Sequence, residues 1–137
     1  MKITFGQKQT FTNNREMTFY EDKLQFVDRG IFSSEFSNTG REFGMFFESQ
    51  FGLKSIIIKP KFSITSGDGV NSFGANSIDV DKGGLKYGAR LDLLPLGKFK
   101  PGNDGYIADL LHEDKIKILA GAAFSYNNGA SNRVGEG

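Results

Sequence analysis

The sequence predicts an all-β chain, an antiparallel meander of about five or six strands with long loops and one short helix. Several stretches alternate between apolar and polar side chains, most clearly "GLKYGARLDLLP" at 84–95. The 18 Gly and 14 Phe, with only 3 Pro, favour strands and turns over helices. The chain has no run of about 18 apolar residues, the length that a transmembrane helix needs.

The overall composition allows one ordinary domain in 137 residues. The 17 basic residues against 16 acidic ones leave a net charge of +1, so nothing in the charge points to a nucleic-acid partner. Cysteine is absent, which excludes disulfides and thiolate metal sites.

The first predicted strand covers 2–7, with Ile3 and Phe5 on one face. Residues 8–40, rich in Asn, Ser and Thr, are predicted to form a long loop. The second strand is predicted at 42–51. It places Phe43, Met45, Phe47 and Phe51 on one face, and Glu42, Gly44, Glu48 and Gln50 on the other. We expect 51–55 to be a tight connection.

The next two strands are predicted at 56–65 and 84–95, separated by a long loop at 66–83 that consists of turn-forming residues. Pro60 lies in the first of these strands and removes one donor from the ladder, which the interior of a sheet tolerates poorly. The first strand alternates Ile56, Ile58, Phe62 and Ile64 with Lys59, Lys61, Ser63 and Thr65. The second alternates Leu85, Tyr87, Ala89, Leu91 and Leu93 with Lys86, Gly88, Arg90 and Asp92.

The connection 96–114 is predicted to contain a turn and then a short helix at 106–113, with His112 on its exposed face. The last strand is predicted at 115–127. It alternates Ile116, Ile118, Ala120, Ala122, Phe124 and Tyr126 with Lys115, Lys117, Gly121 and Ser125. We therefore expect four consecutive antiparallel strands after residue 40. Their shared face is expected to carry Phe43, Phe47, Phe62, Leu91 and Phe124.

The predicted strands are long enough to cross a membrane. Eleven tilted residues cover roughly 28 Å, and the apolar band of an outer-membrane barrel is about 25 Å tall. Alternation alone does not say which face points outward, so a soluble sheet is equally compatible with it. The chain enters a strand pattern at once and stops in the loop-like "NNGASNRVGEG", so we expect an internal fragment, or a chain that lacks its signal.

Three segments resemble, in order, the phosphate-selective porin O and P family in its Bacteroidetes-type version: "LQFVDRGIFSSEFSNTGREFG" (24–44), "LKYGARLDLLPLGKF" (85–99) and "GYIADLLHEDKIKILAGAAFSYNNGA" (105–130). Asp28 and Gly30 depart from the Glu and Ser that are usual there. The resemblance implies a transmembrane β-barrel fragment in the cell outer membrane, with 1–137 as part of one barrel domain. Loop 8–40 would constrict the pore.

The same resemblance implies a porin for the passive diffusion of small solutes, with a preference for anions such as phosphate. Leu85, Leu91 and Leu93 would then face outer-membrane lipid, while Lys86 and Arg90 would face the channel. Such a protein is compatible with a homotrimer of the full-length chain. The alternative is a soluble antiparallel sheet or small barrel that binds an apolar ligand between its Phe-rich faces.

Basic residues outnumber acidic ones on the predicted channel face. They are Lys59, Lys61, Lys86, Arg90, Lys115 and Lys117, against Glu42, Glu48 and Asp92. Basic rings favour the passage of anions. The alternative is a solvated face whose charges pair across strands, such as Lys86 or Arg90 with Glu48.

Three arginines, Arg15, Arg29 and Arg41, lie in or beside the long loop, and the resemblance implies that they contact passing anions. A guanidinium group suits phosphate because its donors are planar and paired. Alternatively, Asp28–Arg29 and Arg41–Glu42 are locally neutralised loop charges.

No motif indicates an enzyme, a cofactor or a metal site. Asp68, Asp79 and Asp81 do not have the spacing of an EF-hand loop, and His112 is the only histidine, so a His pair or a Ser–His dyad with a second base is excluded.

Overall fold

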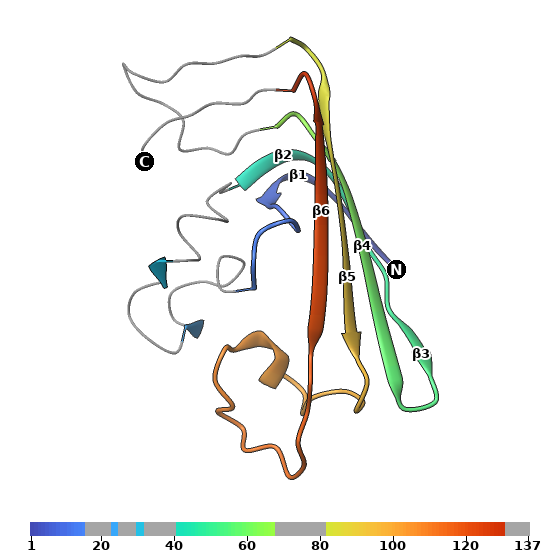
Figure 1. Cartoon of the computed structure of the whole chain (residues 1–137), viewed down its shortest axis with the longest axis vertical. Helices are drawn as coiled ribbons and strands as arrows, with labels where there is room; N and C mark the ends of the chain where they lie inside the picture. The colour runs from blue at the N-terminus through green and yellow to red at the C-terminus, as the bar shows by residue number, and fades with distance from the viewer. Residues whose placement is uncertain (16–22, 25–29, 32–40, 68–81, 131–137) are drawn as a thin grey trace.

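The computed structural model describes residues 1–15, 23–24, 30–31, 41–67 and 82–130. They form one six-stranded antiparallel sheet (Figure 1). The strands are β1 (Lys2–Gln9), β2 (Arg41–Glu48), β3 (Phe51–Leu53), β4 (Ile56–Thr65), β5 (Leu85–Leu94) and β6 (Ala120–Asn128). Their order is β1-β2-β4-β5-β6, with β3 also pairing with β4, so the predicted antiparallel meander is confirmed. Within the described ranges, no helix is long and apolar enough to cross a membrane.

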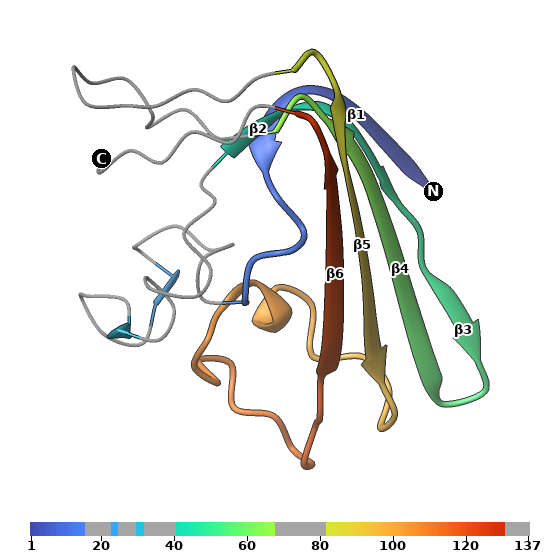
Figure 2. The same cartoon turned by 45° about the horizontal axis from the view of Figure 1, so that its top comes forward.

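The sheet is curved, and the segment after β1 and the connection between β5 and β6 lie on the same side of it (Figure 2). We call this side the inner face and the opposite side the outer face. β1 and β6 are the two edges of the sheet, and neither has a second neighbour among the described strands. Because each step from β1 to β6 along the sheet is antiparallel, these two edge strands run in the same direction.

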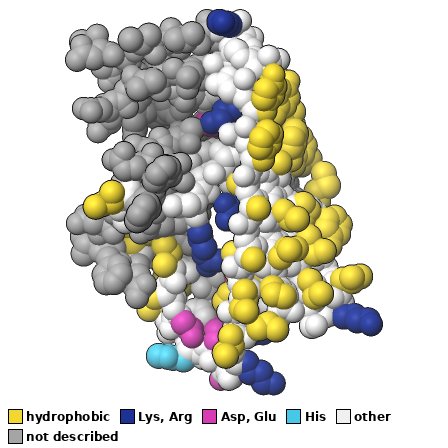
Figure 3. All heavy atoms as spheres, in the orientation of Figure 1, with side chains coloured by type: hydrophobic (Ala, Val, Ile, Leu, Met, Phe, Trp, Pro, Cys, Tyr) yellow, Lys and Arg dark blue, Asp and Glu magenta, His cyan; other side chains and the backbone are white. Residues whose placement is uncertain are grey.

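The outer face carries the apolar side chains that the alternation predicted. Along one row of the sheet, Ile3 faces Phe47, Phe47 faces Phe62, and Ala89 lies between Phe62 and Phe124. Phe43 is 65% exposed and Phe124 is 70% exposed, although both lie in regular strands. Figure 3 shows these hydrophobic side chains as a band over the strands, on the side away from the loops. The predicted shared face is therefore correct.

β2 and β3 are one strand that is interrupted opposite Pro60. The pairing of Glu48 with Lys61 and of Phe51 with Ile58 follows a single register. Between them, the Ser49 amide donates to the Pro60 carbonyl over 3.0 Å, but Pro60 has no N–H to return the bond. The prediction of a tight connection at 51–55 was wrong, because 51–53 is paired and the turn itself is at Lys54, whose φ is 56°.

The last strand is shorter than predicted, because β6 begins at Ala120 and 115–119 are not in a strand. The register that pairs Leu93 with Ala120 would place Ile118 opposite Pro95. Pro95 cannot donate to a ladder, and the chain turns there, with the Gly97 amide donating to the Leu94 carbonyl over 3.3 Å. Residues 115–119 therefore have no partner strand.

The predicted helix at 106–113 is absent, and the regular element in this connection is instead a 3-10 turn, η3 (Asn103–Gly105). The Asp109 carboxylate accepts from the Glu113 amide at 3.0 Å, and the Asn103 side chain accepts from the Leu111 amide at 3.3 Å. These bonds take amide donors away from a helical ladder. His112 is exposed, as expected, but has a φ of 49°, which no α-helix contains.

Candidate functional site

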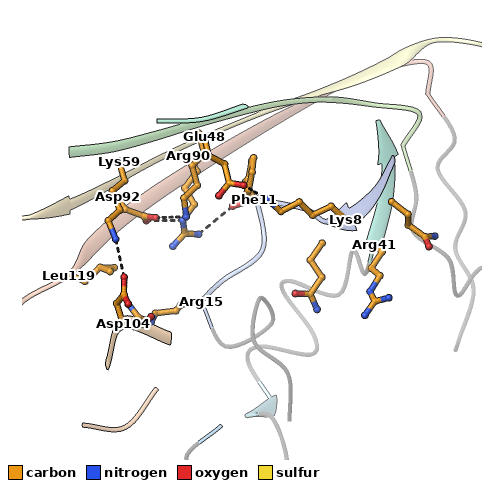
Figure 4. Close-up of a pocket in the computed structure, with 13 residues that line it drawn as sticks. Lys8, Phe11, Arg15, Arg41, Glu48, Lys59, Arg90, Asp92, Asp104 and Leu119 are labelled. Carbon is orange, nitrogen blue, oxygen red and sulfur yellow. Dashed lines mark hydrogen bonds and ion pairs between the residues drawn. The ribbon is translucent and has the colours of Figure 1, made fainter. Parts of the chain in front are cut away.

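The inner face carries a cavity of about 440 Å³, bounded by the sheet, by the segment after β1 and by the connection before β6. Figure 4 shows Lys59, Arg90, Asp92 and Asp104 pointing toward one another from the sheet and the connection, with Lys8 reaching toward Glu48 and Arg41 lying apart from them. Its lining contains the basic side chains of Lys8, Arg15, Arg41, Lys59, Lys61 and Arg90. The carboxylates in the lining are those of Glu48, Asp92 and Asp104. Among the described residues the cavity thus has an excess of positive charge.

Asp92 is the centre of the ion pairs in the cavity. Its carboxylate lies 2.9 Å from the Lys61 ammonium and accepts from Arg90 Nε at 2.7 Å. Lys59 pairs with Asp104 at 3.2 Å and thereby joins β4 to the connection before β6. Lys8 pairs with Glu48 across β1 and β2.

Charges on this face do pair across strands, but the partners differ from those suggested by the sequence. Glu48 pairs with Lys8 and not with Lys86 or Arg90. Lys86 pairs instead with Glu42, and Arg90 pairs with Asp92 on its own strand. Lys8 was missed because the first strand was predicted to end at residue 7, two residues before its observed end at Gln9.

Arg41 differs from the other basic residues of the cavity. It lies at the start of β2, is exposed, and makes no ion pair with Glu42, whose carboxylate is used elsewhere. Within the described ranges, the Arg41 side chain makes no hydrogen bond and no ion pair. Its guanidinium group is therefore available to a ligand in the cavity.

Residues 10–15 cover part of the inner face. Phe11 packs edge-on against Phe46, with ring centroids 5.5 Å apart, and both rings are buried. The Lys8 and Lys61 ammonium groups lie 4.8 Å and 5.7 Å from the centroid of the Phe11 ring. These cation–π contacts hold the ring beneath the cavity.

Arg15 connects this segment to the connection before β6. Its Nη2 donates to the carbonyls of Asp104 and Tyr106 at 3.0 and 3.1 Å. Burial lowers the pKa of Arg15, and the carboxylates of Asp104 and Asp92 partly oppose this effect. The guanidinium group nevertheless stays charged, because an ordinary arginine titrates far above neutral pH.

Lys86 lies outside the cavity, in a buried cluster on the inner face. Its ammonium group is 2.5 Å from Glu42 Oε1, and Thr65 Oγ1 donates to Glu42 Oε2 at 2.7 Å. Glu42 is only 1% exposed. The predicted role of Lys86 in contacting anions is therefore not favoured by its position, since its charge is used to hold β2 and β5 to β4.

The nine basic residues predicted to contact anions thus separate into groups. Those that line the cavity are Arg15, Arg41, Lys59, Lys61 and Arg90. Lys115 and Lys117 lie before β6, where Lys117 Nζ donates to the Leu96 carbonyl at 2.8 Å, so their predicted place on a channel-facing strand was wrong. Arg29 is outside the described residues. Asp104 was missed, because only the folded chain brings 104 next to β4.

No group of three or more His, Asp or Glu side chains that could hold a metal ion occurs in the described part of the chain. Asp68, Asp79 and Asp81 lie outside that part. Comparison with protein-family models, with curated proteins and with solved structures found no match.

Proposed function

We propose that residues 1–137 form part of the wall of an outer-membrane β-barrel, a porin that passes small solutes with a preference for anions. The observation that carries this proposal is the distribution of side chains over the two faces of the sheet. Exposed apolar side chains on the outer face come from every strand: Phe5, Phe43, Leu53, Phe62, Leu91 and Phe124. The inner face instead carries ion pairs and a charged cavity.

This distribution is the reverse of that in a soluble β-barrel, where bulky apolar residues point inward. An apolar surface that extends over a whole sheet is unfavourable in water and favourable against lipid. In transmembrane barrels, lipid-facing and lumen-facing residues alternate along each strand, with a polar interior. Leu91 and Arg90, adjacent in β5, follow this alternation: Leu91 is 43% exposed on the outer face, and the Arg90 guanidinium donates to Asp92 on the inner face.

The open edges of the sheet agree with a part of a larger barrel. Bacterial barrels contain an even number of antiparallel strands, at least about eight. With β2 and β3 taken as one interrupted strand, the path β1-β2-β4-β5-β6 has parallel edges that cannot pair antiparallel with each other. Closure would therefore need an odd number of further strands between β6 and β1.

The preference for anions is supported by the excess of basic side chains around the cavity. Fixed positive charge lowers the electrostatic barrier for an anion in a narrow pore. Phosphate is one such anion, because a free guanidinium group such as that of Arg41 offers it paired donors.

The alternative function, binding of an apolar ligand by a soluble module, requires phenylalanines around a cavity. Among the described lining residues of the inner cavity, Phe11 is the one aromatic side chain, whereas Phe5, Phe43, Phe51, Phe62 and Phe124 are exposed on the outer face. This arrangement favours the porin over the apolar-ligand module.

The proposal is tested by inserting the complete protein into a planar lipid bilayer and measuring conductance and reversal potential under a salt gradient. We expect discrete conductance steps and a reversal potential on the anion-selective side. The isolated chain should aggregate in buffer, because its outer face and both edges lack partners. A monodisperse, cooperatively melting monomer in plain buffer would favour the soluble alternative, and absence of conductance would contradict the porin.

A further inference from the structure

We propose that Arg90 and Arg15 are positioning residues that latch the segment 10–15 onto the inner face, and that the latched segment is a fixed constriction. The latch follows from the geometry of the described residues. Only its consequence for a pore rests on the proposed function.

Arg90 is the attachment point on the sheet. Its Nη1 donates to the carbonyls of Phe11 and Asn13 at 3.3 and 2.9 Å, while its Nε donates to Asp92 at 2.7 Å. The planar fork of an arginine can make these bonds together, whereas a lysine would supply a single ammonium group. Because the Arg90 side chain is only 11% exposed, little of its guanidinium group is left for a passing anion.

Two glycines leave room for this arrangement. A Cβ at Gly88 would lie 2.5 Å from Ser63 Oγ of β4 and 3.1 Å from Thr12 Cγ2, so both β4 and the segment crowd this position of β5. A Cβ at Gly121 would lie 2.4 Å from Asp92 Oδ1 and 2.9 Å from Arg90 Nη2, so the Arg90–Asp92 pair lies directly over β6. A larger side chain at Gly121 would therefore displace the Arg90–Asp92 pair that holds the segment, and one at Gly88 would press on both Ser63 and Thr12.

The far end of the segment is attached to a different part of the chain. Arg15 donates to the carbonyls of Asp104 and Tyr106, and the Ile107 amide donates to the Lys23 carbonyl at 3.2 Å. The loop that follows β1 therefore meets the connection that precedes β6, and these two leave the sheet at opposite ends (Figure 1). A segment that Arg90 holds at Phe11 and Asn13 and that Arg15 holds at its far end, with the Phe11 ring buried, is a fixed obstacle and not a swinging gate.

This assignment separates the arginines by role. Arg90 and Arg15 use their donors to hold backbone carbonyls, whereas Arg41 has no such partner among the described residues. Removing Arg90 should therefore loosen the segment. Removing Arg41 should take the same charge from the cavity and leave the segment in place.

The test uses a cysteine in place of Asn14, within the segment, in the complete protein folded into lipid vesicles. Residues 1–137 contain no cysteine, and any cysteine elsewhere in the complete protein is replaced by serine, so that the new thiol is the only one. The rate of its modification by a small, charged thiol reagent reports how often the segment opens. We expect the Arg90→Ala and Arg15→Ala variants to be modified about tenfold faster or more, because each loses two charge-assisted hydrogen bonds.

Arg41→Ala is the matched control for charge, and Arg90→Lys tests the need for the guanidinium fork. Arg41→Ala should leave the modification rate within about twofold of the parent, and Arg90→Lys should resemble Arg90→Ala. Equal rates for the parent, Arg90→Ala and Arg15→Ala would overturn the latch, as would equal acceleration by Arg41→Ala. If Arg90→Ala does not fold, the Arg15→Ala comparison decides the question.

Conductance of the same variants tests the constriction. A latched constriction predicts a larger or noisier single-channel conductance in the Arg15→Ala and Arg90→Ala variants than in Arg41→Ala. If the rate of thiol modification depends on Arg90 but the protein conducts no ions, the latch is established and the proposed porin function is refuted. If the protein conducts ions but the rate of thiol modification does not depend on Arg90, only the latch is refuted.

Discussion

Replacing Lys86 by Met breaks the buried ion pair of the inner face. The Glu42 carboxylate, 1% exposed, would lose its ammonium partner at 2.5 Å and keep only the Thr65 hydroxyl at 2.7 Å. Removal of one member of a buried pair leaves an uncompensated charge and costs about 3–5 kcal/mol. We therefore expect Lys86→Met to lower the free energy of unfolding by about 3 kcal/mol or more.

The double variant Glu42→Leu/Lys86→Met should recover most of this loss and unfold within about 1 kcal/mol of the parent, because apolar replacement of a whole buried pair is often neutral. The Thr65 hydroxyl would still have an acceptor, because the main-chain carbonyl of residue 86, 3.5 Å away in the present structure, is unchanged by the substitution. Lys98→Met is the matched control, since the same substitution at this exposed position should change stability by less than about 0.5 kcal/mol.

The assay is urea unfolding of the complete protein in lipid vesicles, followed by the circular dichroism of the sheet. A Lys86→Met variant as stable as Lys98→Met would refute the assignment of a buried, structural pair. So would a double variant as unstable as the single one, which would indicate that the volume of the side chains, and not their charge, decides the stability.

Two further predictions concern the cavity and the connection before β6. Replacing Arg29 and Arg41 by Ala should lower anion preference, measured as reversal potential, more than replacing Lys115 and Lys117, which lie off the strand. Removal of Arg41 alone should lower it by about twofold, the factor for one charge at about 8 Å in water, and the effect should shrink as salt rises. Cation preference in the parent would contradict the arginine assignment. The hydrogen bond from the Asn103 side chain, followed by that from the Glu113 amide, lowers the pKa of Asp109. Its stabilising contribution is therefore complete above the unfolded pKa of about 3.9 and is lost as pH falls through the lower, folded pKa. Hydrogen-exchange protection of the Glu113 amide, corrected for intrinsic rates, should fall over that range in the parent and not in Asp109→Asn; equal pH dependence in both would contradict this role.

The sequence by itself determined the meander, the two faces of the sheet and the side chains that each face carries. Period-two alternation is a local property: in a strand, every second side chain points the same way whatever surrounds it. Leu91 and Arg90 could therefore be assigned to opposite faces from a few neighbouring residues. For the same reason, β4 and β5 were predicted with nearly their observed limits. The same reasoning failed wherever a partner strand was needed, as for 115–119, because pairing depends on where the neighbouring strand ends.

Only the tertiary structure decided which charges meet and which of the described basic side chains around the cavity has no partner. Lys8 with Glu48, Lys59 with Asp104 and Lys86 with Glu42 are separated by 40 or more residues, and their pairing depends on register and on how the connections fold back. Arg90 and Arg41 were both predicted to contact anions, but Arg90 is enclosed by carbonyls and a carboxylate, whereas Arg41 is exposed at the start of β2. A charge on a strand face is specified locally, but its partner is specified by the fold, since Coulomb energy depends on distance in space and not on distance along the chain.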